Sequence, residues 1–232
     1  MLALLGANGA GKSTIIKILA KIYTADSGEI YGPNKSSIDD VKFSFIHQDL
    51  GLVEWMTVGE SVALGSEYPR KGKLISWSGV KRMAKDALAT VAPHIDVDDL
   101  ISNLSRADRS LVAIGRALYA KSDVLVLDEP TASLPAEDCA HLFKVLRNLR
   151  EEGVAIVYVS HRLDEIFKVA DRVTVLRDGK VVEDGNINSF TPESLVHAIV
   201  GRETTAFDLG DVSKGAPLLK VTNLSLIHIS EP

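Results

Sequence analysis

Residues 6–14 have the types and spacing that could bind a chain of phosphates. They read GANGAGKST, which is a glycine, four free positions and then Gly-Lys-Ser. Glycines let the backbone wrap closely around an anion, and a helix that begins at such a loop adds unpaired N–H groups and a positive dipole end. Lys12 is expected to reach the β- and γ-phosphates of a triphosphate, and Ser13 is expected to hold Mg²⁺.

Two carboxylates follow a strongly apolar run further along the chain. Residues 124–127 read VLVL, and Asp128 and Glu129 come directly after them. Ligands of parallel α/β sheets bind at the carboxyl ends of the strands, so this pair is predicted to face the phosphates. Asp128 is expected to join the Mg²⁺ shell, and Glu129 to orient or activate an attacking water as a general base. Taken alone, the pair could also be a helix cap.

Three more polar positions could complete such a site. Ser160-His161 ends the next apolar run, so the His161 imidazole is predicted to approach the γ-phosphate. Gln48 ends a short predicted strand and is expected to contact both Mg²⁺ and the water, whereas His47 is interpreted as structural. Ser105 lies at a predicted helix start, where its hydroxyl and the free amides either bind phosphate or simply cap the helix.

The hydrophobic pattern predicts the strands and helices that position these residues. The predicted strands are residues 2–5, 42–46, 124–127, 155–159, 172–176 and 180–183. Helices are predicted to begin at the phosphate loop and to cover residues 136–150 and 162–170. Alternating strands and helices favour a parallel sheet with crossover helices, and Asp178-Gly179 is typical of a hairpin turn.

The chain is predicted to contain one main domain and a tail. Residues 1–203 are assigned to a nucleotide-binding domain that contains a mainly helical part at about residues 59–120. Residues 204–217 lose periodicity and predict a linker, after which residues 218–232 begin another module. The last residues, LIHISEP, are interpreted as non-native.

Smaller features of the main domain are also predicted. Residues 24–32 are expected to form a turn and a short strand, and residues 68–73 (YPRKGK) a solvated basic loop. Ser78 is a possible cap for the helix whose inner face carries Val80 and Met83.

Composition narrows the class of protein. The chain has 232 residues and a net charge of −5, which gives no reason to expect a nucleic acid as partner. Its single cysteine, Cys139, excludes an internal disulfide, fits a reducing compartment and is interpreted as a helix residue. No apolar run approaches the length that spans a bilayer, so we expect any membrane role to come through a partner.

Five ordered motifs carry a family resemblance. GANGAGKST, Gln48, LSRAD (104–108), VLVLDEPT (124–131) and VSH (159–161) together resemble the ATP-binding subunit of an ABC transporter, from residue 2 to about residue 200. The resemblance implies an α/β P-loop NTPase fold, with a mainly parallel sheet flanked by helices, a helical subdomain insertion and a truncated N-terminal β-region. The base-stacking residue would then lie before Met1.

The same resemblance implies the ligands and their residues. It implies ATP and Mg²⁺ as cofactors, with Ser13, Gln48 and Asp128 on the metal and Glu129, His161 and Gln48 in catalysis. Two such domains meet head to tail, so Ser105 would serve an ATP that the partner domain holds. The residues implied to bind ATP within the chain are Gly6, Asn8, Gly9, Ala10, Gly11, Lys12, Ser13 and Thr14.

A narrower resemblance is to importers of monosaccharides such as ribose, xylose and galactose. Residues 160–180, residues 198–203 and the turn at residues 132–135, which lacks the Asp common in the family, are similar to theirs. This implies ATP hydrolysis that powers sugar import, and a peripheral place on the cytoplasmic face of the membrane. The implied partners are a second nucleotide-binding domain beginning at residue 218, permease subunits whose helix presses on residues 51–56, and, indirectly, a periplasmic-type sugar-binding protein.

The signature motif departs from the family pattern of Leu-Ser-Gly-Gly-Gln. Arg106 and Ala107 replace the glycines, and Asp108 puts a negative charge in the place of Gln. The ATP site that this signature completes is therefore expected to be weak or inactive. Two alternatives stay open: a soluble ABC-type ATPase, whose usual basic arms or zinc-binding cysteines are missing here, and a regulatory module that binds ATP with little turnover.

Overall fold

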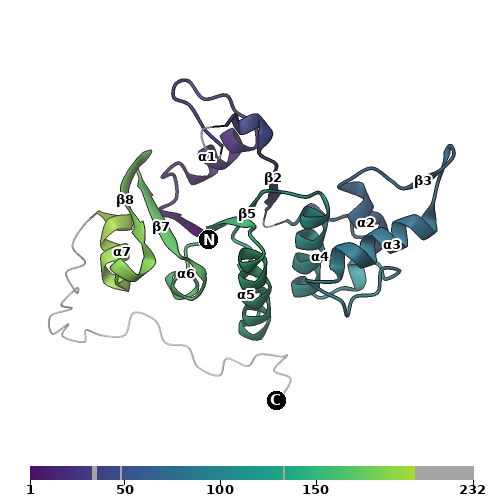
Figure 1. The fold of residues 1–232 in the computed structure, drawn as a ribbon. Helices are drawn as coiled ribbons and strands as arrows, with labels where there is room; N and C mark the ends of the chain where they lie inside the picture. Colours follow the sequence, from purple (N-terminus) through teal and green to yellow (C-terminus); the bar gives the residue numbers. More distant parts are fainter. Residues whose placement is uncertain (33–35, 48, 133, 202–232) are drawn as a thin grey trace, which may run out of the picture. The chain divides into compact units, whose positions relative to one another are not determined.

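The computed structural model divides the chain into two units, Met1–Arg202 and Glu203–Pro232. The residues that the structure describes are 1–32, 36–47, 49–132 and 134–201. The linker predicted at residues 204–217 and the module predicted at residues 218–232 lie outside them. The described part is an α/β fold in which strands and helices alternate along the chain (Figure 1), so the predicted fold class is confirmed.

Six strands form one sheet in the order β2-β5-β6-β1-β7-β8. Their bounds are β1 (Leu2–Gly6), β2 (Phe43–Ile46), β5 (Val124–Asp128), β6 (Ala155–Val159), β7 (Arg172–Arg177) and β8 (Lys180–Asn186). Every neighbouring pair is parallel except β7 and β8, which the predicted Asp178-Gly179 turn joins as a hairpin. The middle residues of β1 and β5 are buried apolar side chains, as expected for parallel strands covered on both faces.

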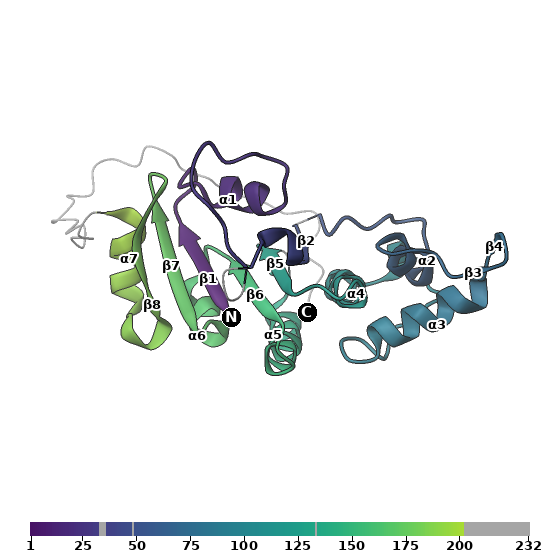
Figure 2. The same cartoon turned by 45° about the horizontal axis from the view of Figure 1, so that its top comes forward.

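Helices cover both faces of this sheet. Helix α1 lies over one face, and α5 and α6 lie over the other (Figure 2). The bounds are α1 (Lys12–Leu19), α2 (Val58–Leu64), α3 (Trp77–Leu88), α4 (Arg106–Tyr119), α5 (Ala136–Glu151), α6 (Leu163–Val169) and α7 (Pro192–Val200). Under α1, a small apolar cluster joins Leu4, Ile16, Val126, Val159 and Leu176. Four strands thus share one buried layer beneath the helix that begins at the phosphate loop.

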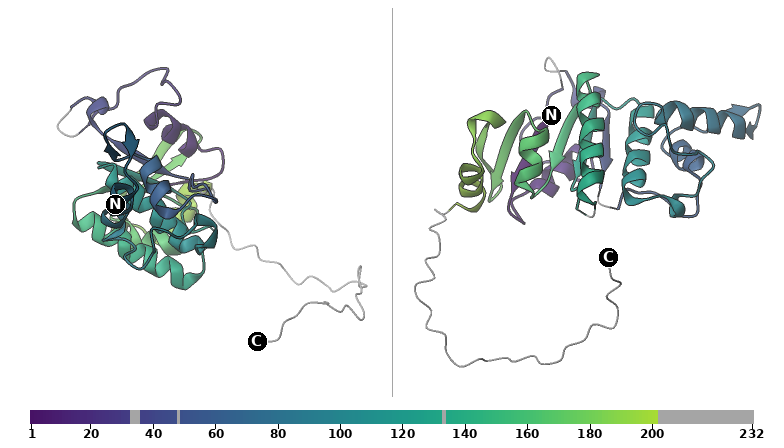
Figure 3. Two further views of the ribbon diagram at one scale, coloured as in Figure 1. Left: turned by 90° about the vertical axis from the view of Figure 1, so that its right-hand side faces the viewer. Right: turned by 90° about the horizontal axis from the view of Figure 1, so that it is seen from below.

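Helices α2, α3 and α4 form a group beside the sheet (Figure 3). Helix α4 also contacts α5 and β2, which ties the group to the sheet. The side chain of Ser76 caps α3 by accepting from the Gly79 N–H at 3.3 Å. The sequence-based choice of Ser78 as the cap is therefore wrong, because the helix begins one residue before it, at Trp77. Among the described residues, no helix is both long and apolar enough to cross a bilayer.

Two local predictions need correction. Residues 68–73 were expected to be a loop, but Arg70–Lys71 (β3) pairs with Leu74–Ile75 (β4) as a hairpin. Gly72 opens its turn with φ = 65°, a conformation that favours glycine. Residues 24–32 contain no strand, and only an isolated bridge joins Tyr31 to Ser37.

The end of β1 requires a glycine because β7 lies so close to it. Gly6 has φ = 152°, and a Cβ there would lie 2.4 Å from the carbonyl oxygen of Leu176. Gly9, at the tip of the phosphate loop, has φ = 82° but no atom within 4 Å of such a Cβ. The two positions therefore require glycine for different reasons: Gly6 because of sheet packing, and Gly9 because of its backbone conformation.

Gly6→Ala is expected to reduce the free energy of unfolding by about 3 kcal/mol, because the added methyl meets backbone that cannot rotate away. Gly9→Ala serves as the control and is expected to cost about 1 kcal/mol, from its left-handed conformation alone. Urea unfolding of both variants measures the difference. Equal losses would contradict the packing argument.

Candidate functional site

The loop between β1 and α1 is held in place by the hairpin of β7 and β8. The Gly179 N–H donates to the carbonyl oxygen of Ala10 at 3.1 Å, and Ala10 itself is buried. Gly11 precedes α1 as its N-cap residue. The rest of the loop faces solvent, and its exposed residues are Ala7, Asn8, Gly9, Ser13 and Thr14.

Lys12 binds to the loop that it follows. Its Nζ donates to the carbonyl oxygen of Gly6 at 2.7 Å and to that of Ala7 at 3.1 Å. The ammonium group is therefore placed by backbone atoms against the start of α1, where N–H groups and the helix dipole also attract anions.

The predicted carboxylates and the predicted histidine come together at one edge of the sheet. Asp128 is the last residue of β5 and pairs in register with Val159, the last residue of β6. Beyond these ends, His161 Nδ1 lies 3.0 Å from Glu129 Oε1. The carboxyl ends of β1, β5 and β6 all reach this edge because the three strands are parallel. The structure thus brings Asp128, Glu129 and His161 together, whereas Ser105 lies at the start of α4 and Gln48 is outside the described residues.

Glu129 has an unusual backbone conformation. Its φ is 51°, which is uncommon for a residue other than glycine, and its N–H donates to the carbonyl oxygen of Val159 at 2.9 Å. This bond joins the turn after β5 to the end of β6. Residues held in sparsely populated conformations cluster at functional sites, where the surrounding structure compensates for the strain.

The electrostatics of Asp128 favour a nearby cation. Burial raises the pKa of its carboxyl above the usual value, and the neighbouring Glu129 carboxylate acts in the same direction. His47 and Lys12 oppose this effect. His47 Nδ1 lies 4.0 Å from Asp128 Oδ2, so the sequence interpretation of His47 as merely structural missed its place at the site. The available signal was its position at the end of β2, whose Ile46 pairs with Leu127.

Gln48 lies outside the described residues, but the segment after it is well anchored. Arg116 of α4 donates to the carbonyl oxygens of Gly51 at 2.9 Å and Leu50 at 3.0 Å. Burial lowers the pKa of Arg116, which is a guanidinium and stays charged. This segment is therefore fastened to α4, whose first turn carries the signature motif.

Ser105 is part of a polar chain at the start of α4. Its hydroxyl donates to Asp108 Oδ2 at 2.8 Å and accepts from the Asp108 N–H at 3.1 Å. The other carboxylate oxygen of Asp108 lies 2.8 Å from His94 Nε2. Ser105 thus caps α4, while its helix packs against α2, α3 and α5. The predictions did not include His94, because nothing in the sequence pairs it with Asp108.

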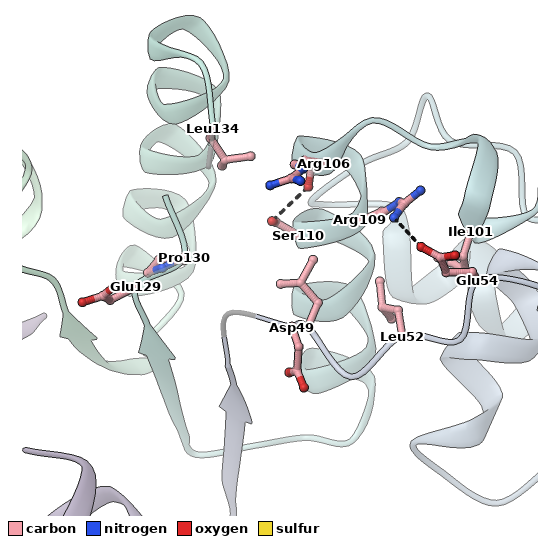
Figure 4. Close-up of a pocket in the computed structure, with 11 residues that line it drawn as sticks. Asp49, Leu52, Glu54, Ile101, Arg106, Arg109, Ser110, Glu129, Pro130 and Leu134 are labelled. Atoms are coloured by element: carbon pink, nitrogen blue, oxygen red, sulfur yellow. Dashed lines mark hydrogen bonds and ion pairs between the residues drawn. The ribbon is translucent and has the colours of Figure 1, made fainter. Parts of the chain in front are cut away.

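A groove of about 260 Å³ separates α4 from the turn after β5. Figure 4 shows Arg106 and Ser110 of α4 on one side, Pro130 and Leu134 on the other, and Leu52 from the segment after β2. Glu129 also lines this groove, so a molecule or segment that entered it would lie close to the edge of the sheet where β5 ends.

Asp128→Asn is expected to raise the melting temperature at pH 8 without nucleotide or Mg²⁺. Burial makes the folded carboxyl hold its proton more tightly than the unfolded one, so the wild type loses stability as the pH rises through the raised pKa. The difference in melting temperature between the variant and the wild type should narrow as the pH falls toward about 4, where the unfolded carboxyl also takes up a proton. Differential scanning calorimetry measures the melting temperatures at both pH values.

Asp98→Asn is the control for that substitution. Asp98 is an exposed carboxylate 2.8 Å from Lys81, and its loss should bring no gain at pH 8. An Asp128→Asn variant that melts below the wild type at pH 8 would refute the argument.

Comparisons with known proteins agree with this geometry. The family model for the ABC transporter matches residues 1–132. The chain is 41% identical to the ribose import ATP-binding protein RbsA of Caldanaerobacter subterraneus subsp. tengcongensis, over 97% of this chain and 47% of that protein. It is 38% identical to a putative ribose/galactose/methyl galactoside import ATP-binding protein of Pseudomonas savastanoi pv. phaseolicola, over 97% and 45%.

The chain spans about half the length of these relatives. Its fold is also similar to that of a solved ATP-binding cassette, a dimer in a post-hydrolysis state bound to ADP and Pi. That match has a TM-score of 0.65 and 24% identity, and it covers 82% of this chain and 86% of the other. The match of the family model to more than half of the chain establishes that this chain belongs to the ABC transporter family.

Proposed function

We propose that this chain binds ATP with Mg²⁺ and hydrolyses it to power monosaccharide import through an ABC transporter. The observation that carries the proposal is the 3.0 Å contact between Glu129 and His161 at the edge of the sheet where the phosphate loop begins. The names of the two import relatives support sugar as the cargo.

The loop would hold the phosphates through its backbone and Lys12. The ammonium exchanges the carbonyl oxygens of Gly6 and Ala7 for phosphate oxygens, to which charge-assisted hydrogen bonds are stronger. The loop amides and the start of α1 add further donors. The residues assigned to this binding are Gly6, Asn8, Gly9, Ala10, Gly11, Lys12, Ser13 and Thr14.

The residues at this edge fit a magnesium ion. Asp128 offers a carboxylate whose charged form burial disfavours, so a cation beside it would stabilise that form. Ser13 offers an exposed hydroxyl, and Gln48 is assigned as a further ligand. When bound, Mg²⁺ would neutralise negative charge on the phosphates.

Glu129 and His161 would carry the hydrolytic step. Glu129 orients the attacking water and accepts its proton, and His161 donates a hydrogen bond to the γ-phosphate. Their contact keeps the carboxylate and the imidazole within reach of the same reacting atoms. The proposal assigns Gln48 to the positioning of the water.

The proposed partners follow from the family arrangement. Ser105 would bind an ATP held by a second nucleotide-binding domain, as expected for cassettes that pair head to tail; the solved cassette above is a dimer. Permease subunits would press on residues 51–56, where Trp55 is 81% exposed and Arg116 links the segment to α4. The chain would then work peripherally at the cytoplasmic face of the membrane, with a periplasmic-type sugar-binding protein as an indirect partner and no nucleic acid.

One observation favours a second function, a regulatory half that binds ATP with little turnover. The Ser105 hydroxyl donates its proton to a hydrogen bond with Asp108 of the same chain, so this proton is not free to bind a phosphate. A phosphate in trans would have to displace that carboxylate, whose negative charge also repels it.

Lys12→Ala and Glu129→Gln, made in the full-length protein, test the proposed function. Lys12→Ala is expected to weaken ATP binding by about 10- to 100-fold, because it removes a charge-assisted contact to phosphate. Glu129→Gln should keep binding but reduce turnover by about 100-fold or more, because it removes the general base. Equilibrium binding of a fluorescent ATP analogue measures the affinity, and the rate of phosphate release measures the turnover. Turnover that persists in Glu129→Gln would contradict the assigned role.

Changing the signature tests whether its altered residues limit ATP turnover. Arg106→Gly with Ala107→Gly, in the full-length protein, is expected to raise ATP turnover at least about two-fold, because the backbone can then approach phosphate closely. Adding Asp108→Asn should raise turnover further by weakening the hold on the Ser105 hydroxyl. Asp98→Asn is the control, because Asp98 is an exposed carboxylate in the segment between α3 and α4. Unchanged turnover would count against the proposed weakness of this site.

A further inference from the structure

A buried carboxylate beneath the catalytic edge has no part in the function proposed above. Glu165 of α6 is only 1% exposed. Its Oε2 accepts hydrogen bonds from three hydroxyls: Thr131 at 2.6 Å, Tyr158 at 2.8 Å and Ser160 at 3.3 Å. These donors come from the turn after β5, from within β6 and from the residue that follows β6. One oxygen atom therefore joins three segments of the chain.

Arg162 holds the other side of this carboxylate. Its Nη1 lies 2.8 Å from Glu165 Oε1 in an ion pair, and Oε1 accepts no hydrogen bond of regular geometry among the described residues. The Arg162 N–H also donates to the Ser160 hydroxyl at 3.0 Å. Buried charges persist when they are paired and hydrogen-bonded, and here three hydroxyls and one guanidinium meet that need.

The hydroxyls that Glu165 binds lie next to the proposed catalytic groups. Thr131 follows Glu129 by two residues, and Ser160 directly precedes His161. Glu129 and His161 are themselves 3.0 Å apart. These contacts form a closed ring, in which Glu165 fixes the positions next to both Glu129 and His161. A displacement of about 1 Å at such groups can reduce the rate by about 100-fold.

We propose that Glu165 is a positioning residue that sets the distance between Glu129 and His161 by binding the hydroxyls of Thr131 and Ser160. This role rests on the proposed ATP hydrolysis for its effect on rate, but the positioning itself can be measured without turnover. Glu165 does not touch substrate in this role, because it acts only through the two hydroxyls.

Glu165→Gln tests the proposal in the full-length protein. The glutamine amide has the same shape but only one oxygen that can accept hydrogen bonds. Its NH₂ group would therefore have to face either the three hydroxyls or the Arg162 guanidinium, which also donates. The kcat for ATP is expected to fall by about 10-fold or more, with KM within about two-fold of the wild type, because Lys12 and its loop are untouched. A purely structural role would not separate kcat from KM in this way.

Two variants control for general effects. Asp164→Asn removes the neighbouring carboxylate, which is 57% exposed and pairs with Arg162 at 3.3 Å and Lys168 at 4.0 Å, and it should leave kcat unchanged. Leu149→Ala in α5 creates a cavity at a fully buried position and should lower the melting temperature without this loss of kcat.

Thr131→Val removes one of the hydroxyls with little change of shape. It should also reduce kcat. Glu165→Gln combined with Thr131→Val should be no slower than Glu165→Gln alone, because the bond that Thr131→Val removes is one of those that Glu165→Gln disturbs. Additive losses would overturn the proposed route. If Glu165→Gln does not fold, Thr131→Val alone decides the question.

The imidazole signals of His161 report positioning directly. The protein is labelled with ¹⁵N-histidine, and the His161→Ala variant assigns the His161 signals in its NMR spectrum. Glu165→Gln and Thr131→Val should each shift these signals and leave those of His94 in place. Asp164→Asn should shift neither. Unchanged His161 signals would overturn the proposal even if the rate falls. A wild type without ATP turnover would refute the proposed function, while the signals would still decide the role of Glu165.

Discussion

The backbone hydrogen bond from Glu129 to Val159 is the constraint on which the site depends. It joins the turn after β5 to the end of β6 at 2.9 Å and holds Glu129 at φ = 51°. Because β5 and β6 are parallel and in register, that turn meets the segment that carries His161. The strain of the unusual conformation is offset by the sheet, which fixes both strands through apolar residues buried on either side.

Much of this arrangement could be predicted because its signals are local. Lys12 follows a glycine-rich run between a strand and a helix, and Asp128 follows four consecutive apolar residues. Such runs identify buried strands whatever the rest of the chain does, and parallel strands place their carboxyl ends at one edge. The buried strands and their parallel arrangement therefore followed from patterns a few residues long.

The remaining features depend on which segments pack together, which a local pattern does not contain. His47 reaches Asp128 only because β2 lies beside β5, and His94 reaches Asp108 only because α3 packs against α4. Glu165 looks like an ordinary acidic residue in the first turn of a helix, yet it is buried among hydroxyls from β6, from the residue after β6 and from the turn after β5. The hairpin at residues 70–75 was missed because its strands are only two residues long.

The close approach of β7 to Gly6 affects how this position can change over evolutionary time. The atom that excludes a larger side chain is the Leu176 carbonyl oxygen, which belongs to the sheet and not to any ligand. A descendant that had abandoned nucleotides altogether would still be obliged to keep glycine there. Retention of Gly6 in a diverged copy is thus a mark of fold ancestry, whereas retention of Lys12 and Glu129 bears on the proposed ATP chemistry.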